Sequence, residues 1–361
     1  MPETFSDDNE LIRDYNVRRS LYADFAVTLE SLVSRVLKEG GINIHSVTHR
    51  VKTVESLNRK LGQEGSRYAA LPDITDLAGV RVTTYFHDDV DKAAQLIERE
   101  FQIDAANSVD KRSLLDPDRF GYLSLHYVLA LSPNRVALPE YRRFENVKAE
   151  IQLRSLLQHV WAEIEHDLGY KSARSVPAII RRRFARLAGL LEIADAEFVT
   201  IRGQLSEYER EVPQRIETEP ETVALDRASL LAFLRENEIL KRLDAAFASY
   251  LGASIEPASD TVVNIYLNTL NFLGIGTIAA LEAALRKNED AINKFAKLWH
   301  RNKRNDYIFD GLSLFDLMRV ILAKEGSRGR IAEWYKSTFS KDPGELPEQI
   351  IETARKAGII T

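Results

Sequence analysis

The sequence predicts an α+β protein: a mixed, mainly antiparallel β-sheet flanked by helices, followed by an all-helical C-terminal domain. Residues 42–155 alternate short β-rich segments with shorter helical ones. Residues 225–361 show one helical pattern of apolar residues after another. The acidic, proline-bearing residues 212–224 read as a linker. We therefore expect a first domain over residues 1–211 and a second after the linker, in keeping with a chain of 361 residues.

Each element of the first domain has its own pattern. Residues 8–38 carry apolar side chains three or four apart and stop at Gly40 and Gly41, which predicts an amphipathic helix with a glycine terminator. Asp88 or Asp89 could cap a helix that follows a strand. Strands are predicted within residues 42–52, 79–86, 122–131 and 144–154, and helices over residues 156–168 and 178–211.

Composition narrows the function classes. Hydrophobic residues make up 45% of the chain, which is enough to bury a proper core. The absence of cysteine excludes disulfides, zinc thiolate sites and a cysteine nucleophile. A net charge of -5 argues against a protein coated in nucleic acid but permits a local basic patch. The acidic N-terminus and the lack of any run of about 18 apolar residues predict a cytoplasmic protein without a membrane partner.

Polar residues alternate along the predicted strands where a structural strand would not need them. Glu150, Gln152 and Arg154 share one face of a strand, and Arg81 lies on another strand that follows Asp76. A solvated sheet face with cross-strand ion pairs explains either strand alone. Together, they favour a site with carboxylates from neighbouring strands.

Further polar residues come from two other segments. Tyr122 and His126 are spaced so that one strand presents both to the same side, although packed sheet residues would show the same pattern. Arg50 and Lys52 end a strand, and Lys60 lies two turns along the next helix. Cations at a strand end that face a pair of acids suit phosphate binding.

Five blocks of this segment, in order, resemble the synthetase domain of RelA/SpoT enzymes. Those enzymes transfer pyrophosphate from ATP to the 3'-hydroxyl of a nucleotide to make alarmones. The resemblance covers about residues 40–205 and implies a nucleotidyltransferase-like fold. The blocks are residues 49–52, 76–81, 121–126, 150–154 and 161–171.

The resemblance implies a role for each matched residue. Asp76 and Glu150 resemble the magnesium pair, and Glu150 also resembles the base that draws the proton from the attacking 3'-hydroxyl. Magnesium is therefore the expected cofactor. The ATP-binding residues would be Arg50, Lys52, Lys60 and Arg81. The acceptor side would comprise Tyr122, which stacks on the base, with His126, Gln152, Arg154, His159 and Lys171.

The departures from the family pattern fall on the acceptor side. Leu123 replaces the usual Arg or Gln, Arg119 is the only cation near the preceding glycine, and His159 stands where alarmone makers often have asparagine. A basic run follows. It is either a solvated helix start or a phosphate-contact surface beside the active site. Its possible nucleic-acid contacts are Arg174, Arg181, Arg182, Arg183 and Arg186.

Three functional hypotheses follow. The first is an ATP-dependent pyrophosphokinase that acts on GTP or GDP to give (p)ppGpp-type alarmones in a stringent response. The second is a toxin that pyrophosphorylates the 3'-CCA end of tRNA and is restrained by the C-terminal domain, as in some small toxic members of the family. The third is a catalytically silent nucleotide-sensing module, which the retention of Asp76 and Glu150 opposes. The C-terminal domain could be a regulatory or antitoxin-like region, and the chain could form a homo-oligomer.

Overall fold

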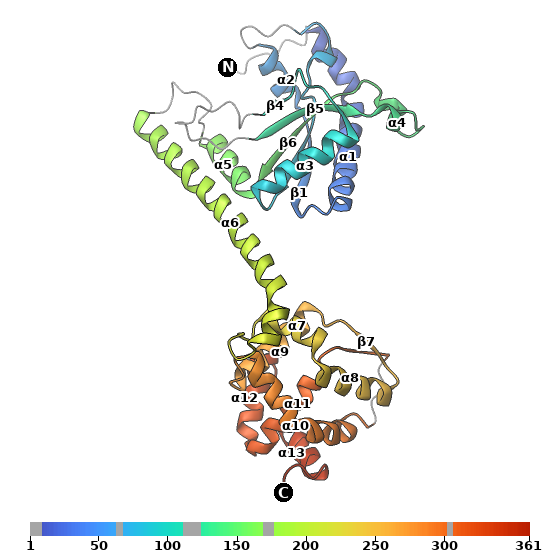
Figure 1. Cartoon of the computed structure of the whole chain (residues 1–361). Helices are drawn as coiled ribbons and strands as arrows, with labels where there is room; N and C mark the ends of the chain where they lie inside the picture. Colours follow the sequence, from blue (N-terminus) through green and yellow to red (C-terminus); the bar gives the residue numbers. More distant parts are fainter. Residues whose placement is uncertain (1–8, 63–67, 111–123, 169–176, 302–305) are drawn as a thin grey trace. The chain divides into compact units, whose positions relative to one another are not determined.

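A computed structural model describes residues 9–62, 68–110, 124–168, 177–301 and 306–361, and the structural statements below concern these residues. The chain divides into two compact units, which Figure 1 shows in sequence colours. Unit 1 comprises Met1–Arg202 and unit 2 comprises Gly203–Thr361. The division therefore comes nine residues before the predicted end of the first domain.

The predicted N-terminal helix is confirmed as α1 (Glu10–Glu39). Asn9 caps it by accepting a hydrogen bond from the backbone N–H of Leu11. Its buried face, which includes Tyr15 and Phe25, packs against the sheet. The chain then leaves the helix through Gly41, whose φ of 72° lies in the left-handed region that favours glycine.

Unit 1 contains a six-stranded sheet of the predicted mixed, mainly antiparallel kind. Its strand order is β1-β2-β6-β5-β3, with β4 paired to β5. Only β2 and β6 pair in parallel; the other neighbours are antiparallel. The strands are β1 (Ile44–Val51), β2 (Ala78–Thr84), β3 (Phe101–Ile103), β4 (Val109–Asp110), β5 (Leu125–Leu131) and β6 (Ala149–Ser155).

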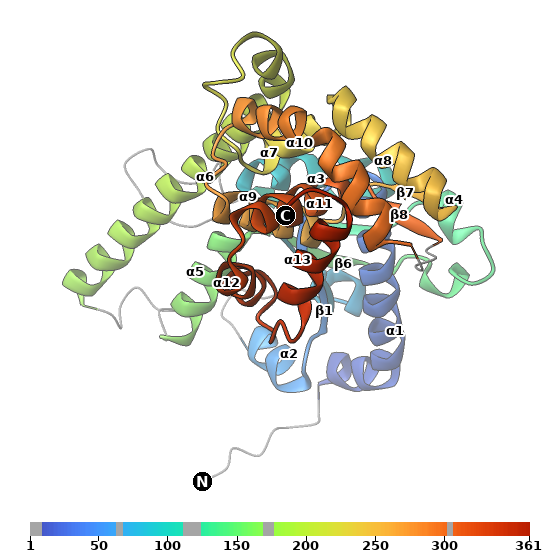
Figure 2. The same cartoon turned by 90° about the horizontal axis from the view of Figure 1, so that it is seen from below.

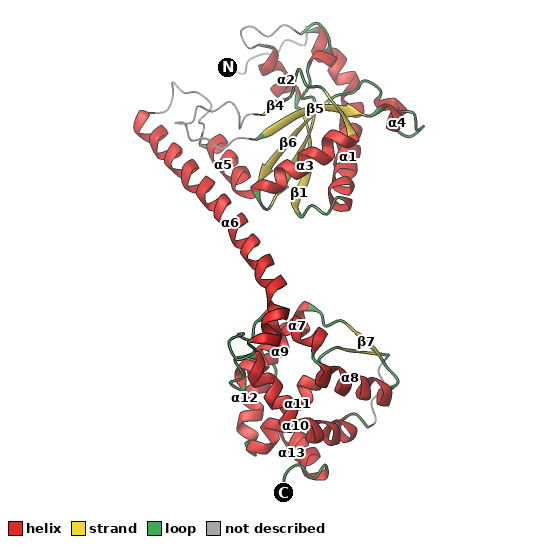
Figure 3. Ribbon diagram, viewed as in Figure 1, coloured by secondary structure: helices red, strands yellow, loops and turns green. Residues whose placement is uncertain are grey.

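Helices cover one face of this sheet, as the ribbon in Figure 3 shows. Alternate residues such as Val80, Val82, Ile151 and Leu153 are buried in the core that α1 and α3 complete. The intervening residues are polar and form the opposite face. The other helices of this region are α2 (Val54–Leu61), α3 (His87–Glu100), α4 (Pro133–Val136) and α5 (Leu156–Asp167), with 3-10 turns at Leu71–Asp73 and Arg142–Phe144.

Asp88 and Asp89 do not cap α3, contrary to expectation. Phe86 occupies the cap position, and both aspartates lie in the first helical turn. There they pair with Lys92 of the same helix and with Arg202 of α6. Arg202 also lies over the ring of Phe86, so these contacts fasten α6 to unit 1.

The predicted linker over residues 212–224 is wrong in its first half. Helix α6 (Ala178–Thr218) continues through Pro213 to Thr218. Val212 is fully buried, and Ile216, one turn later, packs against the core of unit 2. Burial of these two apolar residues outweighs the loss of one helical N–H at the proline, and the surrounding Glu and Gln residues favour helix.

Unit 2 is helical except for one small sheet, so the all-helical prediction needs a correction. Strands β7 (Ser254–Glu256) and β8 (Tyr307–Phe309) pair in parallel. Three-residue strands are too short to produce a sequence period. The helices are α7 (Arg227–Glu236), α8 (Glu238–Leu251), α9 (Asp260–Phe272), α10 (Ile278–Trp299), α11 (Leu312–Glu325), α12 (Arg328–Phe339) and α13 (Leu346–Lys356), seen from another side in Figure 2.

Buried aromatic and aliphatic residues form the core of unit 2. Trp334 is almost completely buried, and its indole N–H donates to the hydroxyl of Thr269 over 3.1 Å. Asp244 of α8 accepts hydrogen bonds from the backbone N–H groups of Gly311 and Ser313 at the start of α11. Among the described residues, no helix is long and apolar enough to cross a membrane.

Candidate active site

The polar face of the sheet aligns residues from four strands in rows. Arg50, Gly79 and Glu150 lie opposite one another across β1, β2 and β6. The next row holds Thr48, Arg81, Gln152 and His126, and the row after it pairs Thr83 with Arg154. Residues directly opposite one another point to the same face. The pairing therefore brings together side chains that lie as much as 104 residues apart in the chain, as for Thr48 and Gln152.

Glu150 lies at the centre of the hydrogen bonds on this face. Its Oε1 is 2.6 Å from Nδ1 of His126, and its Oε2 accepts from Arg50 and Gln152, each over 3.3 Å. Burial raises the pKa of Glu150, but the hydrogen bond and charge of His126, with the charge of Arg50, outweigh it and lower the pKa to about 2. The carboxylate is therefore ionised at neutral pH.

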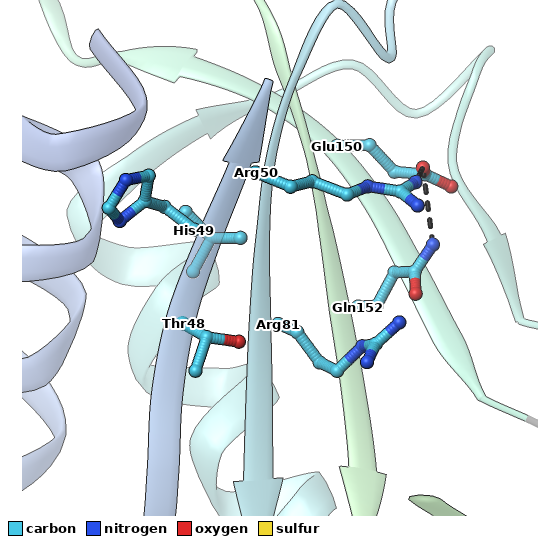
Figure 4. Close-up of a pocket in the computed structure, with 7 residues that line it drawn as sticks. Thr48, His49, Arg50, Arg81, Glu150 and Gln152 are labelled. Carbon is cyan, nitrogen blue, oxygen red and sulfur yellow. Dashed lines mark hydrogen bonds and ion pairs between the residues drawn. The ribbon is translucent and has the colours of Figure 1, made fainter. Parts of the chain in front are cut away.

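Gly79 provides the space that Arg50 needs. Figure 4 shows the Arg50 side chain extending across the sheet toward Glu150, with Arg81 and Gln152 in the neighbouring row. A Cβ atom on Gly79 would lie 3.1 Å from Nε and 3.2 Å from Cγ of Arg50. Glycine at this strand position thus permits the close passage of the arginine over β2.

Two lysines hold Asp76, which lies just before β2. Nζ of Lys52 is 2.6 Å from Oδ2, and Nζ of Lys60, on α2, is 2.8 Å from Oδ1. Burial of Asp76 raises its pKa, but the hydrogen bonds and charges of the two lysines lower it overall. We name these three residues the lysine clamp.

Asp76 and Glu150 fit a magnesium ion in donor chemistry. Because β2 and β6 are parallel, both carboxylates lie toward the same edge of the sheet, where those strands begin. Magnesium prefers one or two carboxylates completed by waters and substrate phosphates. No cluster of three or more His, Cys, Asp or Glu residues suited to a metal occurs among the described residues, so phosphate oxygens would have to supply further ligands.

A second group of cations lies beside Glu150. Arg154 is buried and donates to Oε1 of Gln152 over 2.7 Å, while Arg81 donates to Glu163 of α5 over 2.7 Å. Burial and the charge of Arg81 lower the pKa of Arg154 to about 10, which leaves it charged at neutral pH. Burial also lowers the pKa of His159, as does Arg81. This crowding of cations suits an anionic ligand.

The structure brings together most of the predicted site residues. Arg50, Arg81, Glu150 and Gln152 line one pocket, together with Thr48, His49 and Val80. Lys52, Lys60 and Asp76 form the clamp, while His126 and Arg154 join the network around Glu150 and Gln152. His159 lies 3.8 Å from Glu163. Tyr122, Lys171 and Arg174 lie outside the described residues, as does Leu123.

The four predicted basic residues within α6 are exposed. Arg181, Arg182, Arg183 and Arg186 lie in its first three turns and form no part of the pocket. Two neighbours of the predicted site residues received no role from the sequence. Ser124 Oγ lies 2.5 Å from Nε2 of His126, and Glu163 pairs with Arg81. The spacing of two between Ser124 and His126 could have revealed the first pair, whereas the second joins a strand to a later helix.

Comparisons with known proteins find similar sequences over the segment that carries this polar face. Residues 49–175 match the sequence profile described as the region found in RelA / SpoT proteins. The GTP pyrophosphokinase YjbM of Bacillus subtilis (strain 168) is 30% identical over 167 residues, which cover 45% of this chain and 74% of that protein. The GTP pyrophosphokinase YwaC of the same organism is 27% identical over 165 residues, covering 45% and 75%.

A solved structure also shows partial similarity to this chain. The small alarmone synthetase 2 of Bacillus subtilis shares 27% identity, covers 53% of this chain and 99% of its own, and has a TM-score of 0.44. The family profile and the curated relatives coincide with the segment that carries the polar sheet face. This chain belongs to the RelA/SpoT family of pyrophosphokinases.

Proposed function

We propose that this protein transfers pyrophosphate from ATP to the 3'-hydroxyl of a guanine nucleotide, GTP or GDP, and so makes (p)ppGpp-type alarmones. The observation that supports this most is the ionised Glu150, set between Arg50 and His126 in a pocket on the polar face. The two curated relatives are both named GTP pyrophosphokinases, which agrees with the proposal.

The donor would bind through cations that now pair with carboxylates of the protein. Lys52 and Lys60 hold Asp76, Arg50 contacts Glu150, and Arg81 contacts Glu163. A triphosphate offers these groups more negative charge than single carboxylates do. We infer that Arg50, Lys52, Lys60 and Arg81 exchange part of these contacts for the phosphates of ATP.

The acceptor would approach from the side of Gln152, Arg154 and His126, with Tyr122, His159 and Lys171 completing its contacts. Its 3'-oxygen forms a bond to the β-phosphorus of ATP, the bond from that phosphorus to the α–β bridging oxygen breaks, and AMP leaves with that oxygen. Glu150 accepts the hydrogen bond of the 3'-hydroxyl and finally its proton. A carboxylate with a pKa of about 2 is a weak base, which supports orientation of the hydroxyl first and proton transfer late.

Magnesium fits this proposal through Asp76 and Glu150. When bound, the ion would neutralise the charge that develops on the phosphate oxygens. The protein's own contribution is to keep both carboxylates ionised, which their lowered pKa values favour.

Formation of AMP that depends on the acceptor tests this function. The full chain is incubated with ATP and magnesium, with and without GTP or GDP, and AMP is quantified. We expect AMP to rise only when an acceptor is present and to stay at background with Glu150→Gln. AMP formation that is equal with and without every acceptor would oppose the proposal.

A second candidate acceptor is the 3' end of tRNA. Four exposed arginines lie in the first three turns of α6, and its first turn contains no acidic residue. Cations near a helix N-terminus oppose the helix dipole, so their accumulation there favours a bound polyanion. If tRNA is the acceptor, replacing Arg182 and Arg183 with glutamate should reduce tRNA modification at least tenfold and leave reaction with free nucleotides unchanged.

We also propose that unit 2 regulates the synthetase domain, as an antitoxin-like region would, and that the chain works in the cytoplasm. A chain that ends at Arg202 keeps the fastening of α6 to Asp88 and Asp89. If unit 2 restrains the site, this shorter chain should be more active or more toxic in cells than the full chain. Equal activity of the two chains would exclude restraint by unit 2.

Self-association is a separate proposal. Leu187, Leu190, Phe198 and Ile201 of α6 are each about half exposed or more. Their spacings of three, eight and three place them on one face of α6, which is typical of a helix face that packs on another helix. Sizing the protein by light scattering tests this directly, because a monomer at micromolar concentration would contradict it.

The silent-module alternative would require ATP binding without any transfer.

A further inference from the structure

Tyr15 of α1 is completely buried, and no matched sequence block includes it. Its hydroxyl donates a hydrogen bond of 2.5 Å to the backbone carbonyl of Lys52. A buried hydroxyl needs such a partner, because burial without one costs free energy. The contact joins the N-terminal helix to the lysine clamp, 37 residues further along the chain.

Lys52 lies between the end of β1 and Thr53, which caps α2. Its N–H donates to the carbonyl of Leu77 over 2.9 Å, next to Asp76 in sequence. The Tyr15 hydroxyl thus holds the carbonyl side of Lys52, while the Leu77 carbonyl holds the amide side. With both sides fixed, the ammonium group reaches Asp76 over 2.6 Å.

The electrostatics keep Tyr15 a donor. Burial raises the pKa of its hydroxyl; Arg19 opposes this, and the charge of Asp76 raises the pKa further. The hydroxyl therefore remains protonated across the physiological range.

We propose that Tyr15 is a positioning residue for the donor site: its hydroxyl fixes the backbone of Lys52 and so aims the lysine at the site of the ATP phosphates. This inference rests on the proposed role of Lys52 in ATP binding. Tyr15 itself touches no reacting group. Its loss should weaken donor binding without changing the affinity for the acceptor.

The chain contains a matched control. Tyr22 lies two turns further along α1, is also buried, and its ring centroid is 5.9 Å from that of Tyr15. The charged neighbours of its hydroxyl are Arg18 and Asp14 rather than residues of the clamp. Tyr15→Phe and Tyr22→Phe therefore remove the same atom from the same helix, and only the first should affect Lys52.

Two measurements on the full chain test the inference. The first is the Kd for a non-hydrolysable ATP analogue. We expect this Kd to rise about threefold to tenfold in Tyr15→Phe, because one hydrogen bond is lost, and to stay unchanged in Tyr22→Phe. The second is the rate at which an amine-reactive ester labels Lys52, read by peptide mass spectrometry. It should rise several-fold in Tyr15→Phe only, while the labelling of Lys241, on unit 2, stays constant.

The two readouts separate this inference from the proposed function. Weaker analogue binding and faster Lys52 labelling in Tyr15→Phe support the positioning role even if the wild-type protein transfers no pyrophosphate. Pyrophosphate transfer by the wild-type protein with equal values in both variants would overturn the positioning role and leave the proposed function standing. Faster labelling without any change in analogue affinity would also overturn it, because Lys52 would then not serve the donor.

Discussion

At the scale of single residues, the site contains two carboxylates whose pKa values are lowered because hydrogen-bond donors from other elements contact them. His126 of β5 and Arg50 of β1 contact Glu150. Lys52 and Lys60 contact Asp76. Each carboxylate is at least partly buried, so an unpaired charge would be costly. In the proposed reaction, these cations are already in place for a phosphate ligand and do not have to be gathered when it binds.

Gly79→Ala tests the passage of Arg50 over β2. The new Cβ would force the arginine side chain to shift by a few tenths of an ångström or more, which disturbs its contact with Glu150. We expect the KM for ATP to rise at least threefold with a small change in Tm. Gly62→Ala is the control, because its Cβ would meet nothing closer than 3.5 Å. Equal kinetics in both variants would contradict the role of Gly79.

The depressed pKa of Glu150 predicts how acid affects unit 1. Glu150 has a folded-state pKa of about 2, below its ordinary pKa of 4.5, so its ionised form stabilises the fold when the pH is above 4.5. This stabilisation is lost as the pH falls from about 5 toward 2. The loss is on the order of 3 kcal/mol. Glu150→Gln should make this dependence shallower in urea unfolding followed at Trp161. An unchanged pH dependence would show that Glu150 titrates normally.

At the scale of elements, α6 is unusual in crossing from one compact unit to the other. Gly203 lies at the division between the units, inside the helix, and apart from its chain neighbours and the nearby helix backbone no atom lies within 4 Å of the position a Cβ would take. Gly203→Ala should therefore stabilise the protein by about 0.5 to 1 kcal/mol through helix propensity alone. Urea unfolding measures this, and Gly203→Pro should destabilise instead. A loss of stability with alanine would indicate that the helix bends there.

The sequence predicted the elements of the site better than their partners. Alternation of polar and apolar residues in β2 and β6 was enough to place Arg81, Glu150 and Gln152 on one face. Which side chains contact one another, such as Arg50 and Glu150, depends on how strands from distant segments pair. The register of that pairing does not appear in any local sequence pattern. The linker prediction failed for a related reason, since the burial of Val212 and the packing of Ile216 on the core of unit 2 do not appear in any local sequence pattern.

At the scale of the whole molecule, the two units should respond to pH in opposite directions. Burial raises the pKa of Asp244 in unit 2 to about 6, against hydrogen bonds from Ser313 and Gly311 that lower it. The folded state therefore binds this proton more tightly than the unfolded state does. The resulting stabilisation is fully present below about pH 4 and is lost as the pH rises through 6.

Hydrogen exchange followed by mass spectrometry separates the two responses. After correction for intrinsic rates, protection in α8 and α11 should increase from pH 7 to pH 5, while protection in β2 and β6 should not. Asp244→Asn should flatten the response of unit 2 and leave unit 1 unaltered. Parallel pH profiles in both units of the wild-type protein would be inconsistent with the raised pKa of Asp244.

Mass spectrometry of the reaction products tests whether the polar face of the sheet transfers pyrophosphate. The full chain is incubated with ATP, magnesium and a panel of GDP, GTP, ATP and bulk tRNA, with Glu150→Gln as the blank. We predict AMP and a guanine nucleotide heavier by one diphosphate, formed only by the unmutated protein. A modified tRNA 3' end without a free-nucleotide product would show that tRNA, rather than a guanine nucleotide, is the acceptor. If the protein binds ATP but transfers pyrophosphate to no acceptor, the proposed function is wrong.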